Sequence, residues 1–188
     1  MPLETELKYL GVDLDALRQR LQSLGADFQA RRFERNLVFD DAGRSLRDRG
    51  ILVRLREDGR SILTLKRPPE GPVPQGVKAW DELDTELTDS GVVQAVLQTL
   101  GCEVAFAYEK WREEWKFGGC HICLDQLPFG DFVEIEGPPE SIFAAARVLG
   151  LDSRHSSTEN YHQLNREYRA AEGLPEDDNF VFPPKGAS

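Results

Sequence analysis

The stretch Leu3–Leu10 reads LETELKYL, and its charged residues fall at every second position. In an extended strand, Glu4, Glu6 and Lys8 would share one side, while mostly apolar side chains would share the other. This period of two indicates a β strand rather than a helix. The polar side of the predicted strand is unusual because it carries charges of both signs.

The same alternation recurs in later segments that are rich in Leu, Val and Ile. The polar positions are Arg54 and Arg56, Thr64 and Lys66, Glu82, Asp84 and Glu86, Lys110 and Arg112, Asp125, and Glu134 and Glu136. Helices expected between the strands have apolar stripes, which would pack on the apolar sides of the strands. The polar sides would then face one another. The sequence therefore predicts a mainly antiparallel α+β fold whose sheet curls or closes around a charged lumen.

Glycine, proline and aspartate residues mark the turns between the predicted elements. Asp58-Gly59 is typical of a two-residue hairpin turn, here between strands 51–57 and 60–67. The Pro- and Gly-rich residues 68–76 predict a mobile loop. The other expected strands are 28–40, 77–88, 105–117, 120–127 and 131–136. The expected helices are 14–24, 91–100, 139–149 and a last one that starts at a capping box in residues 156–159 and reaches about Ala170.

Length and composition indicate one globular domain, expected over residues 1–172 and followed by a poorly ordered tail at 173–188. The 33 acidic and 23 basic residues give a net charge of -10, which argues against a nucleic-acid partner because binding phosphates needs a basic face. No apolar run approaches the roughly 18 residues of a membrane span, so no membrane association is expected. An N-terminus without a secretory signal and an odd number of cysteines, three, favour a cytoplasmic setting.

The expected lumen would bring lysines and arginines close to several carboxylates. Clustered charges in a confined space are costly unless a ligand or a metal balances them. Basic groups suit phosphate oxygens, and pairs of carboxylates suit Mg²⁺ or Mn²⁺. The residues alone therefore predict a polyphosphate that is held together with a divalent metal.

Several short motifs occur in a fixed order along the chain. The first, Glu4-Thr-Glu6-Leu-Lys8, has the form ExExK. It is followed by Arg54-Leu-Arg56, Thr64-Leu-Lys66, Glu82-Leu-Asp84-Thr-Glu86, Lys110-Trp-Arg112, Leu124-Asp125 and the run from Gly130 to Gly137 that contains Glu134 and Glu136. In this order they resemble the CYTH superfamily, the triphosphate tunnel metalloenzymes, over roughly residues 3–165. That superfamily includes class IV adenylyl cyclases, thiamine triphosphatases and inorganic triphosphatases.

The resemblance implies an eight-stranded closed β tunnel with flanking helices, which holds a triphosphate lengthwise. It implies Mg²⁺ or Mn²⁺ as the cofactor, with Glu4, Glu6, Glu134 and Glu136 as ligands and Asp125, Glu82 and Glu86 as additional or second-metal acids. The implied phosphate-binding residues are Lys8, Arg54, Arg56, Lys66, Lys110 and Arg112. The residues expected to act in catalysis are Lys8, Arg54, Arg56, Lys66 and Glu82.

The preferred function is metal-dependent hydrolysis of inorganic triphosphate, ATP, thiamine triphosphate or another organic triphosphate. Cyclisation of ATP to cyclic AMP and pyrophosphate stays open, although the His-Phe that precedes ExExK in some class IV cyclases has no room before Glu4. A module that binds triphosphate without turnover is the third alternative. The last helix departs from the family, because Glu159-Asn160-Tyr161 stands where Lys-Ser-Tyr is frequent. No sequence pattern bears on the oligomeric state.

Overall fold

The computed structural model describes residues 3–184. Its strands are β1 (Leu3–Leu10), β2 (Asp27–Asp40), β3 (Leu52–Glu57), β4 (Ser61–Arg67), β5 (Lys78–Leu87), β6 (Glu103–Phe117), β7 (Cys120–Leu127), β8 (Gly130–Glu136) and the short β9 (Ser156–Ser157). Its helices are α1 (Leu14–Ser23), α2 (Ser45–Asp48), α3 (Ser90–Thr99), α4 (Pro139–Leu149), the 3₁₀ turn η1 (Ser153–His155) and α5 (Tyr161–Ala171). The strand bounds agree with the sequence-based prediction to within a few residues.

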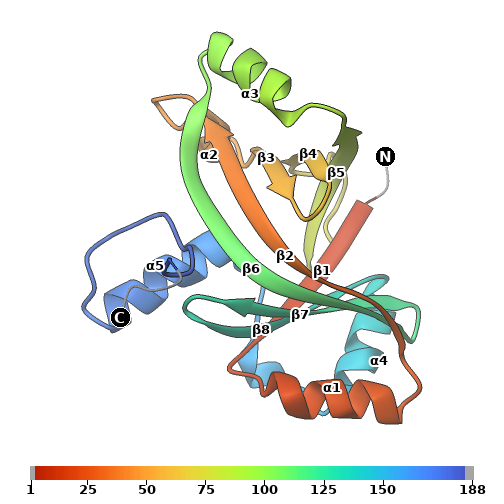
Figure 1. The fold of residues 1–188 in the computed structure, drawn as a ribbon. Coiled ribbons are helices and arrows are strands. Elements are labelled where there is room, and N and C mark those ends of the chain that lie inside the picture. The colour runs from red at the N-terminus through yellow and green to blue at the C-terminus, as the bar shows by residue number, and fades with distance from the viewer. Residues whose placement is uncertain (1–2, 185–188) are drawn as a thin grey trace.

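The sheet closes on itself, as Figure 1 shows. Within residues 3–184, eight strands follow one another in the order β5-β4-β3-β2-β6-β7-β8-β1, and β1 pairs again with β5. All of these pairings are antiparallel. The predicted mainly antiparallel tunnel with flanking helices is therefore confirmed.

Strand β1 closes the ring by pairing with different neighbours along its length. Its first residues pair with β5, up to Glu6 opposite Lys78, and from Glu6 onward it pairs with β8. Strand β5 begins at Lys78, opposite Glu6, so it does not reach Lys8 and Tyr9 of β1. There β9 pairs with β1 instead. At Glu6, Lys8 and Tyr9, β1 thus has a paired strand on both sides.

This use of residues 156 and 157 as a strand corrects the predicted start of the last helix. Helix α5 is capped by Asn160, whose side chain accepts a 2.8 Å hydrogen bond from the backbone N–H of Gln163. Ser157 instead accepts a bond from the backbone N–H of Glu159, 3.0 Å away. The capping box was wrong because the open edge of β1 competes for these serines, and sequence spacing does not reveal that edge.

The apolar sides of the strands face outward and are covered by helices, as the alternation predicts. Leu21 of α1 and Ile142 of α4 are fully buried in one cluster with Ile122 and Ile135 of the sheet. Helices α1 and α4 lie together against the β7–β8 end of the ring (Figure 1). Because the apolar sides are occupied in this way, the charged sides are left to line the interior.

Part of the segment after α5, where the sequence predicts a poorly ordered tail, contacts β6. Phe180 is buried and stacks on Tyr108 with 4.9 Å between ring centroids. Its backbone N–H donates to the carbonyl of Ala107, and its carbonyl accepts from Glu109. Strand β7 pairs with β6 only from Trp111 onward, so the preceding edge of β6 is available to this segment. Phe180 thus packs on β6, while residues 185–188 lie outside the described residues.

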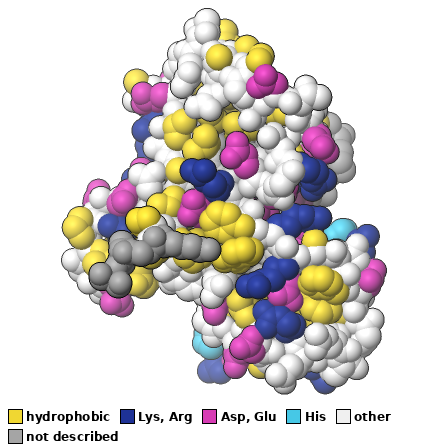
Figure 2. All heavy atoms as spheres, viewed as in Figure 1, with side chains coloured by type: hydrophobic (Ala, Val, Ile, Leu, Met, Phe, Trp, Pro, Cys, Tyr) yellow, Lys and Arg dark blue, Asp and Glu magenta, His cyan; other side chains and the backbone are white. Residues whose placement is uncertain are grey.

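Among residues 3–184, no helix combines the length and the apolar character that a membrane crossing requires. Acidic and basic side chains are interspersed on the face shown in Figure 2.

We expect Phe180→Ala to lower the free energy of unfolding by about 3 kcal/mol, because it removes a buried ring from the aromatic cluster on β6. Chemical denaturation in urea measures this loss. Val181→Ala is the matched control, because the Val181 side chain, next in sequence to Phe180, is 45% exposed. This substitution should change the free energy of unfolding by less than about 0.5 kcal/mol. Equal urea midpoints for the two variants would contradict the packing of this segment.

Candidate active site

The charged sides of the strands meet in a cavity of about 350 Å³ inside the ring. All six predicted phosphate-binding residues line it: Lys8, Arg54, Arg56, Lys66, Lys110 and Arg112. The acids that line it include Glu4, Glu6, Glu82, Glu134 and Glu136. The structure therefore brings together residues from β1, β3, β4, β5, β6 and β8, as far as 132 positions apart in the sequence.

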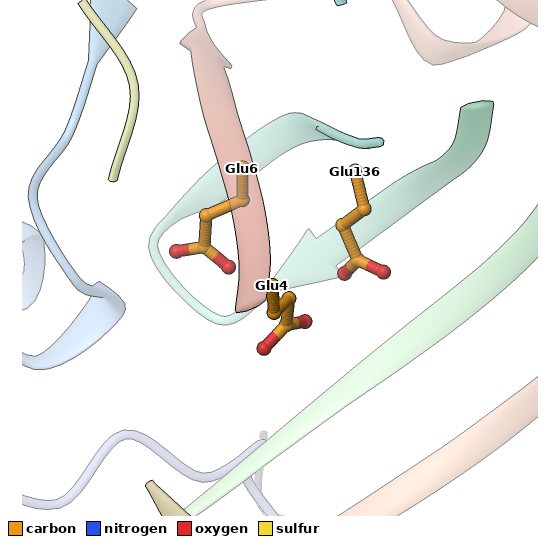
Figure 3. A group of neighbouring side chains, drawn as sticks. All are labelled: Glu4, Glu6 and Glu136. Carbon is orange, nitrogen blue, oxygen red and sulfur yellow. The ribbon is translucent and has the colours of Figure 1, made fainter. Parts of the chain in front are cut away.

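Three of the predicted metal ligands form a compact group, shown in Figure 3. Carboxylate oxygens of Glu4, Glu6 and Glu136 lie within 4.8 Å of one another. The pairing of β1 with β8 sets Glu6 directly opposite Glu136, and Glu4 is the next inward residue along β1. Oxygens that share one Mg²⁺ or Mn²⁺ at roughly 2.0–2.2 Å have this order of separation, and both ions prefer oxygen ligands. We call these residues the carboxylate trio.

Two members of the trio hold their protons more tightly than ordinary glutamates. Burial is the main cause that raises the pKa of Glu4 to about 8, and a hydrogen bond with Glu82 adds to it. Burial also raises the pKa of Glu136 to about 7, and the neighbouring carboxylates of Glu134 and Glu6 add to the effect. Acids crowded in this way are relieved either by protons or by a bound cation.

Lys8 links β1 to β8 next to the trio. Its Nζ atom lies 2.9 Å from Glu6 and 2.7 Å from Glu134. Burial alone would lower the pKa of Lys8, but the two carboxylates outweigh it and raise that pKa. Burial alone would raise the pKa of Glu134, and Lys8 with Arg112 instead holds it well below the usual range. Glu134 is thus an ionised partner of two cations and lies outside the trio.

Lys66 of β4 makes a similar link between Glu4 of β1 and Glu82 of β5. Its Nζ atom lies 2.8 Å from Glu4 and 2.8 Å from Glu82. Burial would raise the pKa of Glu82, but its hydrogen bond with Glu4 and the charge of Lys66 lower it to about 2. Glu82 also lies 3.9 Å from Arg54. It is therefore a carboxylate that holds two phosphate-binding candidates in place.

Asp125 and Glu86 are not near the trio. Asp125 is fully buried and accepts hydrogen bonds from Lys110 at 3.1 Å, Arg112 at 2.7 Å and the Tyr161 hydroxyl at 2.7 Å. The side chain of Glu86 is 62% exposed, and its ion-pair partner is Arg60, 3.9 Å away. Asp125 therefore orients cations of the lumen, and Glu86 lies at the exposed end of β5. Neither belongs to the group of adjacent carboxylates that the trio forms.

Sequence reasoning missed Glu34, a buried acid on β2. It lies 3.6 Å from Lys110 and 3.9 Å from Arg56. Burial would raise its pKa, but Lys110 and the nearby arginines lower it to about 2. Strand β2 carries charges on both sides, so its alternation gives no clear inward direction. The inward direction of Glu34 follows only from the pairing of β2 with β3 and β6, whose charged sides the sequence does identify.

Helix α5 contributes Tyr161 to the interior. Its ring centroid lies 5.0 Å from Nζ of Lys8 and 5.3 Å from Nζ of Lys110, which is cation–π distance. Arg154, which precedes this helix, and Arg166, which lies on it, pair with Asp152 and Asp178 and do not line the cavity. The motif Glu159-Asn160-Tyr161, which departs from the family pattern, therefore places a tyrosine and not a cation beside the lumen lysines.

Comparison with known proteins places this chain in a family. The family model described as the CYTH domain matches residues 2–147. The chain belongs to the CYTH family. CYTH members are triphosphatases or adenylyl cyclases, which confirms the predicted enzyme class and implies a triphosphate substrate.

Relatives of this CYTH chain carry related descriptions. A Methanocaldococcus jannaschii protein named "Putative adenylate cyclase" is 25% identical over 149 residues, which cover 78% of this chain and 83% of that protein. A Vibrio parahaemolyticus structure with the same description has a TM-score of 0.76 and 23% identity, covering 87% of this chain and 97% of that one. A Hippeastrum structure, described as revealing a dominant triphosphatase activity, has a TM-score of 0.58 and 17% identity, covering 95% and 99%. The two structures show the shared fold.

The raised pKa values of Glu4 and Glu136 predict how the metal-free protein responds to pH. Between the ordinary value of 4.5 and the folded values of about 8 and 7, the folded chain holds more protons than the unfolded chain. We therefore expect stability in EDTA to fall as pH rises through this window, and Mg²⁺ or Mn²⁺ to restore it. Urea denaturation at intervals from pH 5 to 8.5 measures the slope.

The control is the double variant Glu4→Gln/Glu136→Gln, in which this slope should flatten. His162 has a lowered pKa because of burial and works in the opposite direction near pH 6.5. It contributes equally to both proteins, so it cancels in the difference between them. Parallel pH profiles for wild type and double variant would show that the two glutamates are not responsible.

Proposed function

We propose that this CYTH protein hydrolyses a triphosphate in a divalent-metal-dependent reaction inside the ring. The observation that carries the proposal is the carboxylate trio at one part of a cavity that the six predicted phosphate-binding lysines and arginines also line. A site for a polyanion alone would need the cations but not three adjacent carboxylates. The combination fits a phosphate chain whose charge is shared between protein cations and a metal ion.

The residues that would hold the metal are Glu4, Glu6 and Glu136. Their oxygens are hard donors, their spacing suits one ion, and two of them have raised pKa values that a cation would reverse. A bound divalent ion would neutralise phosphate charge and could lower the pKa of a water molecule. The ordered carboxylates keep this chemistry at a fixed place in the cavity.

The cations would bind the phosphate chain and stabilise the charge that develops on the leaving group. Lys8 and Lys66 flank the trio, and Arg54 donates from the β3 side, where Thr64 and the Tyr108 hydroxyl hold its guanidinium at 3.1 Å each. Fixed cations in a partly desolvated cavity act strongly on a phosphoryl group, because they need little reorganisation when its charge shifts. Glu82 would serve by keeping Lys66 and Arg54 in position.

Cyclisation of ATP is the second candidate, and the names of the relatives favour it. It would use the same phosphate-binding residues, with the ribose 3′-hydroxyl attacking the α-phosphorus and pyrophosphate leaving.

The three described cysteines are free, and two of them are buried. They support a reducing, cytoplasmic setting for either reaction.

A product screen decides between these reactions. The protein is incubated with inorganic triphosphate, ATP or thiamine triphosphate, each with Mg²⁺ or Mn²⁺ and each with EDTA. We expect orthophosphate in the metal-containing samples. Cyclic AMP with pyrophosphate from ATP would instead select the cyclase, and tight binding without any product would select a binding module.

Glu136→Gln should reduce metal-dependent phosphate release at least a hundredfold, because an amide replaces one negative oxygen donor of the trio. Glu86→Gln is the control from the same set of sequence-predicted acids, and its exposed position predicts activity within about twofold of wild type. Steady-state rates at varied Mg²⁺ measure both. Full activity in Glu136→Gln would remove the trio from the mechanism.

A further inference from the structure

Lys78 is the first residue of β5 and lines the same cavity, yet no sequence motif includes it. Strand pairing sets it opposite Glu6, and the next inward residue of β5, Trp80, lies opposite Glu4. Lys78 therefore stands beside the carboxylate trio, on the strand that neighbours β1. Its side chain is half-buried.

Its charge is balanced differently from that of the other cavity cations. Within residues 3–184, Lys78 is the one cavity-lining lysine or arginine with no carboxylate oxygen within 4.0 Å. Its Nζ atom instead lies over the ring of Trp80, 5.0 Å from the centroid. Glu6, Glu134 and Glu159 attract it from beyond ion-pair distance, while Lys8 repels it.

A partly desolvated ammonium without an ion pair is unfavourable for the folded protein alone. A contact with an aromatic face compensates less than a hydrogen-bonded carboxylate does. Lys78 can therefore take an anionic partner without first giving one up. Lys8 and Lys66, in contrast, each have to loosen two existing ion pairs.

We infer that Lys78 is a triphosphate-binding residue, which donates from Nζ to phosphate oxygens beside the carboxylate trio. The inference rests on the proposed function, because it places the anion at the same part of the cavity. It adds a seventh cation to the site and predicts that this cation contributes to affinity more than to the chemical step. Trp80 would keep the lysine side chain extended along the cavity wall in the absence of substrate.

Calorimetric titration with inorganic triphosphate in EDTA tests the inference without turnover. We expect Lys78→Gln to weaken binding about tenfold or more, which is the effect of losing a hydrogen bond to a charged group. Lys78→Arg should stay within about threefold of wild type because it keeps the charge. Lys116→Gln, which removes an exposed lysine of β6 that does not line the cavity, should bind as wild type does.

Two further readouts separate binding from a structural role. With Mg²⁺ and inorganic triphosphate, Lys78→Gln should raise KM about tenfold while kcat changes less than threefold. Its melting temperature without ligand should equal or exceed that of wild type, because no ion pair is lost. A lower melting temperature in both Lys78 variants would assign the lysine to folding and overturn the inference.

The remaining outcomes are equally decisive. Unchanged affinity in Lys78→Gln, or equal weakening in Lys78→Gln and Lys116→Gln, would overturn the role of Lys78 and leave the proposed function intact. A wild-type protein that binds no triphosphate, with or without Mg²⁺, would overturn the proposed function and this inference with it.

Discussion

The charges inside the ring have to balance one another, because most of the side chains that carry them are buried from solvent. Lys8 between Glu6 and Glu134, and Lys66 between Glu4 and Glu82, are the clearest examples. Removing one member of such a set leaves its partner buried and unpaired, which costs more than the pair itself contributes. The residues of the lumen therefore depend on one another, and no single one can be assigned an independent contribution.

The same requirement for paired charges applies when a substrate binds. Under the proposed function, phosphate oxygens replace carboxylates as partners of the cations, and a divalent ion replaces the protons and lysines that now accompany the trio. In this exchange each cation and each carboxylate keeps a partner of opposite charge, so a net charge of -10 on the whole chain is compatible with a polyanionic ligand. The net charge sums over the whole chain, whereas binding depends on the local arrangement of opposite charges.

Much of this arrangement could be predicted from the sequence because a strand has an exact period of two. Charges at alternate positions in β1, β3, β4 and β8 assign those side chains to one side, and the helices that cover the other side turn them inward. Where the pattern is broken, prediction fails. Glu34 lies on a strand with charges on both sides, and Lys78 is an isolated lysine directly after a Pro- and Gly-rich loop.

Two other features depend on contacts that no local pattern encodes. The N-cap of α5 moved to Asn160 because Ser156 and Ser157 pair with an open edge of β1. Phe180 is ordered because β7 leaves part of β6 uncovered. Each is a consequence of strands of unequal length meeting in a closed ring. Only the assembled ring reveals which edges remain to be covered.

The position of β1 in the ring has a consequence for folding. This strand precedes the other strands of the ring along the chain, yet its partners β5 and β8 lie more than 70 and more than 120 residues further on. The ring therefore cannot close until nearly all of the domain has been made, and this long-range pairing predicts slow folding. Until then β1 keeps two open edges, and its alternating charges protect it, because a strand that carries Glu4, Glu6 and Lys8 is a poor template for aggregation.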